Sequence, residues 1–120
     1  TAADAESVAS SLPYSGGRLV GVGGELVYSG AGGIFRRDRA TGAWTPLVSG
    51  AGRALATGAA RFALVALTDA GAALFDRELH RLGPIATPYP AAETLSALVV
   101  GNRLLLGTSG YGLWEGRLPE

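Results

Sequence analysis

Residues 97–118 read ALVVGNRLLLGTSGYGLWEGRL, and this stretch decides the fold class of the chain. Two short apolar runs, Leu98–Val100 and Leu104–Leu106, flank the dipeptide Gly101-Asn102. Gly-Asn between apolar runs is typical of a two-residue β-hairpin turn, because both residues tolerate the positive φ that such a turn needs at its centre. A small, polar loop then precedes Leu113-Trp114. The stretch therefore predicts three short antiparallel strands.

The same order of features occurs three times along the chain. An apolar strand, a turn, a second apolar strand and a small or polar loop precede each of three triplets: Gly33-Ile34-Phe35, Ala73-Leu74-Phe75 and Gly112-Leu113-Trp114. Repeats of about 40 residues with four short strands each are typical of β-propeller blades. Helical repeats need longer windows of 3.6-residue period, and Gly or Pro interrupts nearly all such windows here. Only residues 3–11 offer a short helix, as an alternative to a strand.

A fourth strand in each unit is indicated by a proline followed by an apolar residue. Thr45-Pro46-Leu47 and Gly83-Pro84-Ile85 have this pattern, and proline is typical of edge strands because it has no N–H to donate to a ladder. The third unit has no such segment after Trp114. A matching piece, Leu12-Pro13-Tyr14, instead precedes the first unit.

These patterns predict an all-β chain that forms a single domain, 1–120, of three four-stranded propeller blades. The blades are expected at residues 18–48, 53–86 and 94–118, with residues 8–14 completing the last blade, in trans. Three blades do not close a ring, since propellers use about four to eight. An open wedge would also expose the apolar faces of its end blades. We therefore expect a homodimer that closes a six-bladed ring, or else a chain that is one half of a larger propeller.

Composition excludes several classes of function. Ten acidic and ten basic residues cancel, which gives no reason to expect nucleic-acid binding. Cysteine is absent, which excludes disulfides and thiolate metal sites and leaves the compartment open. No apolar run reaches the roughly 18 residues of a membrane helix, and the first twelve residues lack the pattern of a signal peptide. All basic residues are Arg, which suggests a GC-rich bacterial genome.

Two stretches carry a resemblance to known repeats. LVYSGAGGIFRRDRATGAWTPL (26–47) and LLLGTSGYGLWEG (104–116) resemble the propeller repeats grouped as bacterial-neuraminidase-repeat or Asp-box-like, and also those of two-component sensor ectodomains. Asp38, Gly42 and Trp44, with Thr41, lie near the Asp-box layout, in which Asp and Gly shape a turn and Trp packs between strands. The resemblance implies a propeller fold and no particular activity.

Candidate catalytic groups do not form a recognisable constellation. The only histidine, His80, lies in an expected outer loop, where an exposed turn residue is the better interpretation. The carboxylates that a glycosidase pair could draw on are Asp69, Asp76, Glu78, Glu93 and Glu115, and no spacing singles out a pair. The glycine runs at 21–24 and 30–33 each precede a strand rather than a helix, unlike phosphate-binding loops. We expect no catalytic, cofactor or metal site.

One face of the expected ring is the candidate binding surface. The loops that join second to third strands and fourth to first strands should meet on this face, and loops on a rigid scaffold often carry function. They place seven polar or aromatic side chains there: Ser29, Arg53, Asp69, Tyr89, Glu93, Ser109 and Tyr111. Phe35, Phe75 and Trp114 recur at equivalent positions, which favours packing between blades over a repeated sugar platform.

The sequence thus predicts a non-catalytic binding or scaffold module that engages a protein partner through its loop face. The alternative from another class is carbohydrate recognition, either lectin-like or as a fragment of a neuraminidase-like glycosidase.

Overall fold

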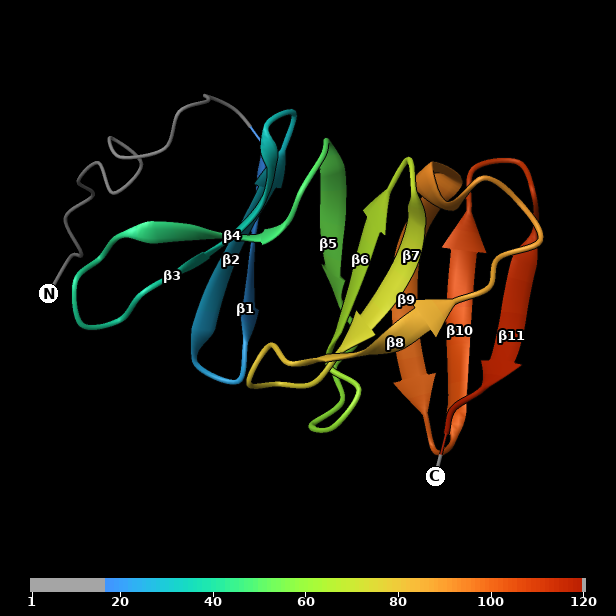
Figure 1. Cartoon of the computed structure of the whole chain (residues 1–120). Helices are drawn as coiled ribbons and strands as arrows, with labels where there is room; N and C mark the ends of the chain where they lie inside the picture. Colours follow the sequence, from blue (N-terminus) through green and yellow to red (C-terminus); the bar gives the residue numbers. More distant parts are fainter. Residues whose placement is uncertain (1–16, 120) are drawn as a thin grey trace, which may run out of the picture.

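The computed structural model describes residues 17–119, which contain eleven β-strands, one 3-10 turn and no α-helix (Figure 1). The strands are β1 (Arg18–Val22), β2 (Glu25–Gly30), β3 (Gly33–Arg37), β4 (Trp44–Val48), β5 (Gly52–Ala56), β6 (Leu64–Thr68), β7 (Gly71–Phe75), β8 (Arg81–Ile85), β9 (Thr94–Val100), β10 (Arg103–Thr108) and β11 (Leu113–Arg117). Each lies where the sequence pattern predicted a strand. The 3-10 turn η1 (Ala91–Glu93) was not predicted. The helix considered at 3–11 and the strand expected at 8–14 lie outside the described residues.

The strands form three separate antiparallel sheets. Sheet 1 has the order β1-β2-β3-β4, sheet 2 the order β5-β6-β7-β8, and sheet 3 the order β9-β10-β11. The all-β prediction is confirmed. Every connection within a sheet joins neighbouring strands, so each sheet is a simple meander. Sheet 3 has three strands in the described part of the chain, and β11 is at its edge.

The hairpin that decided the fold class forms, with a different turn from the expected one. Val100 pairs with Arg103 across the two-residue turn. Gly101 has a φ of 61°, whereas Asn102 is not among the residues with positive φ. A single positive φ, carried by glycine at the first central position, is typical of a type II′ turn, so the prediction of positive φ at both positions was wrong. The turn between β1 and β2 has positive φ at both Gly23 (55°) and Gly24 (85°).

Hydrogen-bond register corrects the alignment of the first two units. Phe35 pairs with Pro46 in sheet 1, and Ala73 pairs with Pro84 in sheet 2. The structural counterpart of Phe35 is therefore Ala73, two positions before Phe75. A shift of two residues keeps each side chain on the same face of its strand, so the expected orientation of the aromatic residue is unaffected.

The sheets pack face to face in chain order, with sheet 2 in the middle (Figure 1). Leu64 and Ala66 of β6 belong to one apolar cluster with Val27 and Ile34 of sheet 1. The alternate residues of β6 belong to a second cluster, whose members from sheets 2 and 3 include Val65, Leu67, Leu74, Leu104 and Leu106. Every residue of β6 is buried because successive side chains point to opposite sheets. Sheet 2 is thus covered on both faces.

The outward face of sheet 3 is apolar and exposed. On sheet 3 this face carries Leu98, Val100 and Leu113, which are 52%, 55% and 74% exposed. Ile34 and Ala72 hold the positions that correspond to Leu113 in the other sheets and are 0% and 6% exposed. The same type of position is therefore core in sheets 1 and 2 and surface in sheet 3.

Candidate functional site

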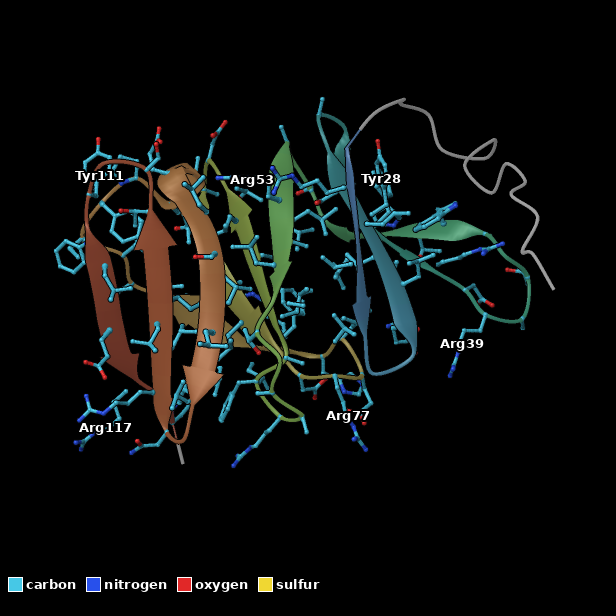
Figure 2. All side chains as sticks on the ribbon, turned by 180° about the vertical axis from the view of Figure 1, so that it is seen from behind. Tyr28, Arg39, Arg53, Arg77, Tyr111 and Arg117 are labelled. Carbon is cyan, nitrogen blue, oxygen red and sulfur yellow. The ribbon has the colours of Figure 1, made fainter. Side chains whose placement is uncertain are left out.

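The loops expected to share one face do lie at one end of the molecule. The connections β2–β3, β4–β5, β6–β7, β8–β9 and β10–β11 all lie at the upper end in Figure 1. In Figure 2, Arg53 and Tyr111 lie at this end, while Arg77 and Arg117 lie at the opposite end. We call the first of these the loop end.

An arginine holds the longest connection of the loop end in place. Arg53 of β5 donates hydrogen bonds through Nη2 to the carbonyl oxygens of Ala92 and Thr94, the latter at 2.6 Å. The backbone N–H of Ser109, in the β10–β11 loop, donates to the carbonyl oxygen of Glu93 at 2.9 Å. Contacts from sheets 2 and 3 therefore fix the η1 segment. This arrangement makes the loop end a preformed surface.

Three aromatic rings stack beside η1. The ring of Tyr89 lies 6.0 Å from that of Tyr111 and 5.8 Å from that of Trp114, with interplanar angles of 24° and 29°. The Tyr89 hydroxyl hydrogen-bonds to Thr94 Oγ1 at 2.9 Å, and Trp114 Nε1 donates to the carbonyl oxygen of Tyr111 at 2.7 Å. Tyr89 is buried, whereas Tyr111 and Trp114 are exposed. Tyr111 therefore presents an exposed ring that stacks on the buried ring of Tyr89.

The structure brings five of the seven predicted site residues together through hydrogen bonds and ring stacking, and Asp69 lies in the neighbouring β6–β7 turn, whose two strands also contact η1. Those that gather around η1 are Arg53, Tyr89, Glu93, Ser109 and Tyr111. Asp69 is exposed in the β6–β7 turn. Ser29 is buried, and its Oγ accepts a hydrogen bond from the backbone N–H of Ala54 at 3.1 Å, which links sheets 1 and 2. Ser29 and Tyr89 therefore serve packing, which corrects their assignment to an exposed binding face.

Two residues that lie beside η1 were not predicted as site residues. Thr94 is fully buried and meets both Arg53 and the Tyr89 hydroxyl. For Trp114 the sequence favoured packing between blades over a sugar platform, yet its side chain is exposed. The alternation of side chains along β11 does place Trp114 on the face toward sheet 2, where Tyr89 also lies. The sequence alone could therefore have indicated the orientation of Trp114.

Two aspartate side chains outside the loop end accept hydrogen bonds within surface turns. Asp38 Oδ1 accepts hydrogen bonds from the N–H groups of Thr41 and Ala40, at 3.0 and 2.8 Å, and these bonds lower the pKa of its carboxyl group. Desolvation opposes the charged form of Asp76, but hydrogen bonds from His80 and Glu78 outweigh it and lower the pKa of that carboxyl group.

His80 is exposed, with its Nδ1 3.3 Å from Asp76 Oδ2. The pair closes a surface turn. Within residues 17–119, no group of three or more His, Cys, Asp or Glu side chains is placed to hold a metal ion.

The first strands of the three sheets line a shared hollow. It has a volume of about 500 Å³, is open to solvent, and is bordered by β1, β5 and β9. Its lining includes Arg18, Leu19, Leu55, Leu95 and Ser96. The first strands of the three sheets, β1, β5 and β9, therefore approach one another around this hollow.

Comparison with protein-family models, curated proteins and solved structures gives no significant match. In the described part of the chain, no helix has the length and apolar character needed to cross a membrane.

Proposed function

We propose that this chain is a non-catalytic binding module of the β-propeller type, which closes a six-bladed ring with a second copy and presents its loop end to a protein partner. The observation that carries the proposal is the unequal burial of corresponding positions. Leu113 is 74% exposed, whereas Ile34 and Ala72 are in the core. A second copy that placed its sheet 1 against this face would bury Leu113 as its counterparts are buried.

Three features support the propeller arrangement. The sheets are successive four-stranded or three-stranded meanders, as blades are. The first strands converge on one hollow, whereas β4 and β8 lie at the outer edges of sheets 1 and 2. Each described connection from a last strand to the next first strand passes along the loop end, as a ring of blades requires.

The two end faces are suited to each other. Leu98, Val100 and Leu113 give sheet 3 an aliphatic outward face. The outward face of sheet 1 carries an aromatic group in which the buried ring of Tyr28 lies 6.5 Å from that of Phe35 and 6.2 Å from that of Trp44, and the last two are half-buried. Aliphatic and aromatic side chains pack well together, and contiguous apolar faces on soluble proteins often mark interfaces. Because these faces differ, pairing joins sheet 3 of one copy to sheet 1 of the other, and two such contacts close a ring.

The loop end supports binding rather than catalysis. Two of its polar groups hold the η1 segment in place: Arg53 bonds two carbonyl oxygens, and the Tyr89 hydroxyl bonds Thr94. The exposed Tyr111 ring, beside Ser109, offers a rigid contact surface. Tyrosine is enriched in protein interfaces because it adds a large area with few rotatable bonds.

Carbohydrate recognition is the second candidate, and one observation favours it. Tyr111 and Trp114 expose aromatic surface at the loop end, and aromatic faces can stack on sugar rings. The first two units have no aromatic residue at the position of Tyr111, because Ala31-Gly32 and Asp69-Ala70 form the corresponding turns. A lectin of this type would therefore have one sugar site per chain.

A site-specific cross-linking experiment distinguishes these functions. A photo-reactive amino acid is placed at Tyr111, and in a matched control at Arg77, which is exposed at the opposite end (Figure 2). We expect proteins to be cross-linked at position 111, and we expect none of the same proteins to be cross-linked at position 77. We also expect no binding on a glycan array. Glycan binding that Tyr111→Ala abolishes would favour the lectin instead. Equal adducts at both positions would contradict the assignment of the loop end.

A further inference from the structure

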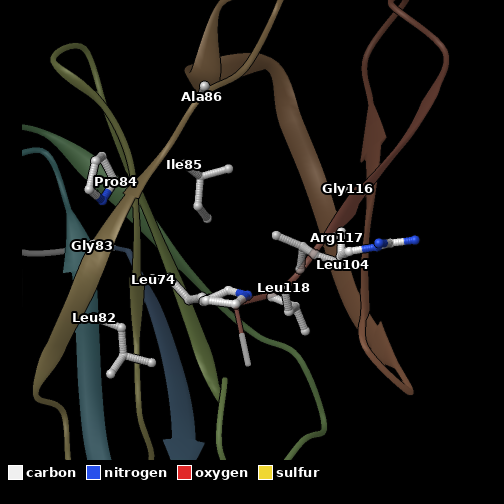
Figure 3. Close-up of a pocket in the computed structure, with 11 residues that line it drawn as sticks. Leu74, Leu82, Gly83, Pro84, Ile85, Ala86, Leu104, Gly116, Arg117 and Leu118 are labelled. Carbon is white, nitrogen blue, oxygen red and sulfur yellow. The ribbon is translucent and has the colours of Figure 1, made fainter.

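The outer edge of β11 lies beside an apolar groove. β11 pairs with β10, and no other strand of residues 17–119 pairs with it, whereas the corresponding third strands β3 and β7 pair with β4 and β8. A groove of about 260 Å³ runs between β8 and the end of β11 (Figure 3). Its lining is mainly apolar and includes Leu74, Leu82, Ile85, Leu104 and Leu118. The groove lies where a fourth strand of sheet 3 would pack against sheet 2.

The sequence before β1 matches the sequence of a fourth strand and its linker. Residues 12–18 read LPYSGGR, and residues 45–53, which run through β4 into β5, read TPLVSGAGR. Both segments have a proline, an apolar residue, Ser-Gly and a final Gly-Arg. The two arginines also correspond in register, since Arg18 pairs with Ser29 where Arg53 pairs with Leu67. In sequence, residues 12–14 therefore match part of β4.

A fourth strand belongs to the sheet that precedes the one its linker enters. β4 belongs to sheet 1, and its linker leads into β5 of sheet 2. Residues 12–14 lead into β1, so they correspond to the outer strand of a sheet that precedes sheet 1. In a ring of two copies, that sheet is sheet 3 of the other copy.

The open edge of the chain's own sheet 3 is too far away for this segment to reach. From Tyr14 to Arg18 the backbone spans at most about 14 Å. Sheet 2 separates sheets 1 and 3, and packed sheets lie about 10 Å apart, so away from the convergent first strands the β11 edge of sheet 3 is about 20 Å from sheet 1. A second copy whose sheet 1 rests on sheet 3 brings the segment within reach.

We infer that residues 12–14 of a second copy add to β11 as its fourth, antiparallel strand, with Pro13 opposite Trp114. This inference rests on the ring-closing pair proposed above. The register follows from sheets 1 and 2, where Pro46 lies opposite Phe35 and Pro84 opposite Ala73. It places Leu12 opposite Glu115. Pro13 then shares the face of Trp114 that looks toward sheet 2, which is the side of β11 on which the groove lies.

Disulfide trapping tests the register, because the chain has no cysteine of its own. Single variants Leu12→Cys and Glu115→Cys are mixed and oxidised, with Leu12→Cys and Arg117→Cys as the matched control two positions along β11. Directly opposite residues have Cβ atoms about 4.5–5.5 Å apart, whereas diagonal neighbours are about 7–8 Å apart and are poorly placed for a disulfide. We expect the mixed disulfide at position 115 at least ten times faster than at position 117.

Each outcome bears on a different part of the inference. Equal rates at positions 115 and 117 would overturn the register. An internal disulfide in a monomeric Leu12→Cys/Glu115→Cys double variant would overturn the exchange between copies. A dimeric mass by light scattering without any disulfide would overturn the added strand and leave the proposed ring in place. A monomeric mass for the unmodified chain would contradict the proposed ring of two copies.

Discussion

Leu113→Ala should weaken self-association while leaving the isolated chain almost unchanged. Full burial of a leucine side chain is worth about 1.5–3 kcal/mol, and 74% of Leu113 is exposed, so docking would add about 1–2 kcal/mol per copy. A ring of two copies has two such contacts, and the dimer therefore loses about 2–4 kcal/mol. That loss corresponds to a rise in the dissociation constant of about 30- to 1,000-fold.

Sedimentation equilibrium over a range of concentrations measures this change directly. Urea unfolding at low and high protein concentration supplies the second readout. Below the dissociation constant, the variant and the original chain should unfold within about 0.5 kcal/mol of each other, because Leu113 is then a surface residue. Above it, only the original chain gains stability, by mass action. Ala40→Gly, in the exposed β3–β4 loop, is the matched control. An unchanged dissociation constant for Leu113→Ala would refute the reasoning.

Three further predictions concern the core, the η1 segment and the turns. Leu67→Ala removes a side chain that is 1% exposed and should cost about 2–5 kcal/mol in urea unfolding; a cost below about 1 kcal/mol would contradict the burial of sheet 2 on both faces. Arg53→Met leaves the carbonyl oxygens that it bonds without their donor, so the backbone amides of residues 91–94 should exchange faster with deuterium while those of β6 should not. The lowered pKa values of Asp38 and Asp76 contribute stability that is fully present above the unfolded value near 3.9 and is lost as pH falls through the lower folded values. Asp38→Asn/Asp76→Asn should therefore reduce the drop in urea midpoint between pH 5 and pH 2, and an identical drop would contradict the role given to these carboxylates.

The strands and their order could be predicted from the sequence because local signals agree there. Turn glycines, apolar runs and the two prolines of β4 and β8 recur in one order, and each has a direct effect on backbone conformation. The orientation of the repeated residues also followed, because alternation along a strand fixes which side chains share a face. These signals depend only on residues that are close in the chain.

The alignment of the units was less reliable because it was anchored on side chains. Matching Phe35 with Phe75 makes the spacing between the first two units two residues longer than the spacing between Phe35 and its structural counterpart, Ala73. The residues that fix the backbone give the correct offset: Gly33 and Gly71, with φ of 137° and 130°, end equivalent turns. Asp38 and Asp76 have the same offset, and both accept N–H bonds in the turn that follows. Positions that shape the backbone are therefore the better guide to register.

The site was predicted only in outline, because burial near a loop depends on neighbouring sheets. Ser29 and Tyr89 are polar residues at strand and loop ends. The N–H group that bonds Ser29 belongs to Ala54 of sheet 2, and the rings that stack on Tyr89 belong to Tyr111 and Trp114, which are far away in the sequence. The contact of Arg53 with the η1 carbonyls joins residues about 40 positions apart, which no local pattern reports. Long-range contacts of this kind decide which loop residues are available to a ligand.

The molar mass of the unmodified chain in solution tests the central claim most directly. Multi-angle light scattering across a concentration series should give a species of twice the chain mass of 12.1 kDa, with no larger assembly, since two end-to-end contacts use up both apolar faces. A chain that stays at 12.1 kDa up to its solubility limit would contradict the account. A mass that keeps rising with concentration would also contradict it, because it would show that the contacts form an open filament.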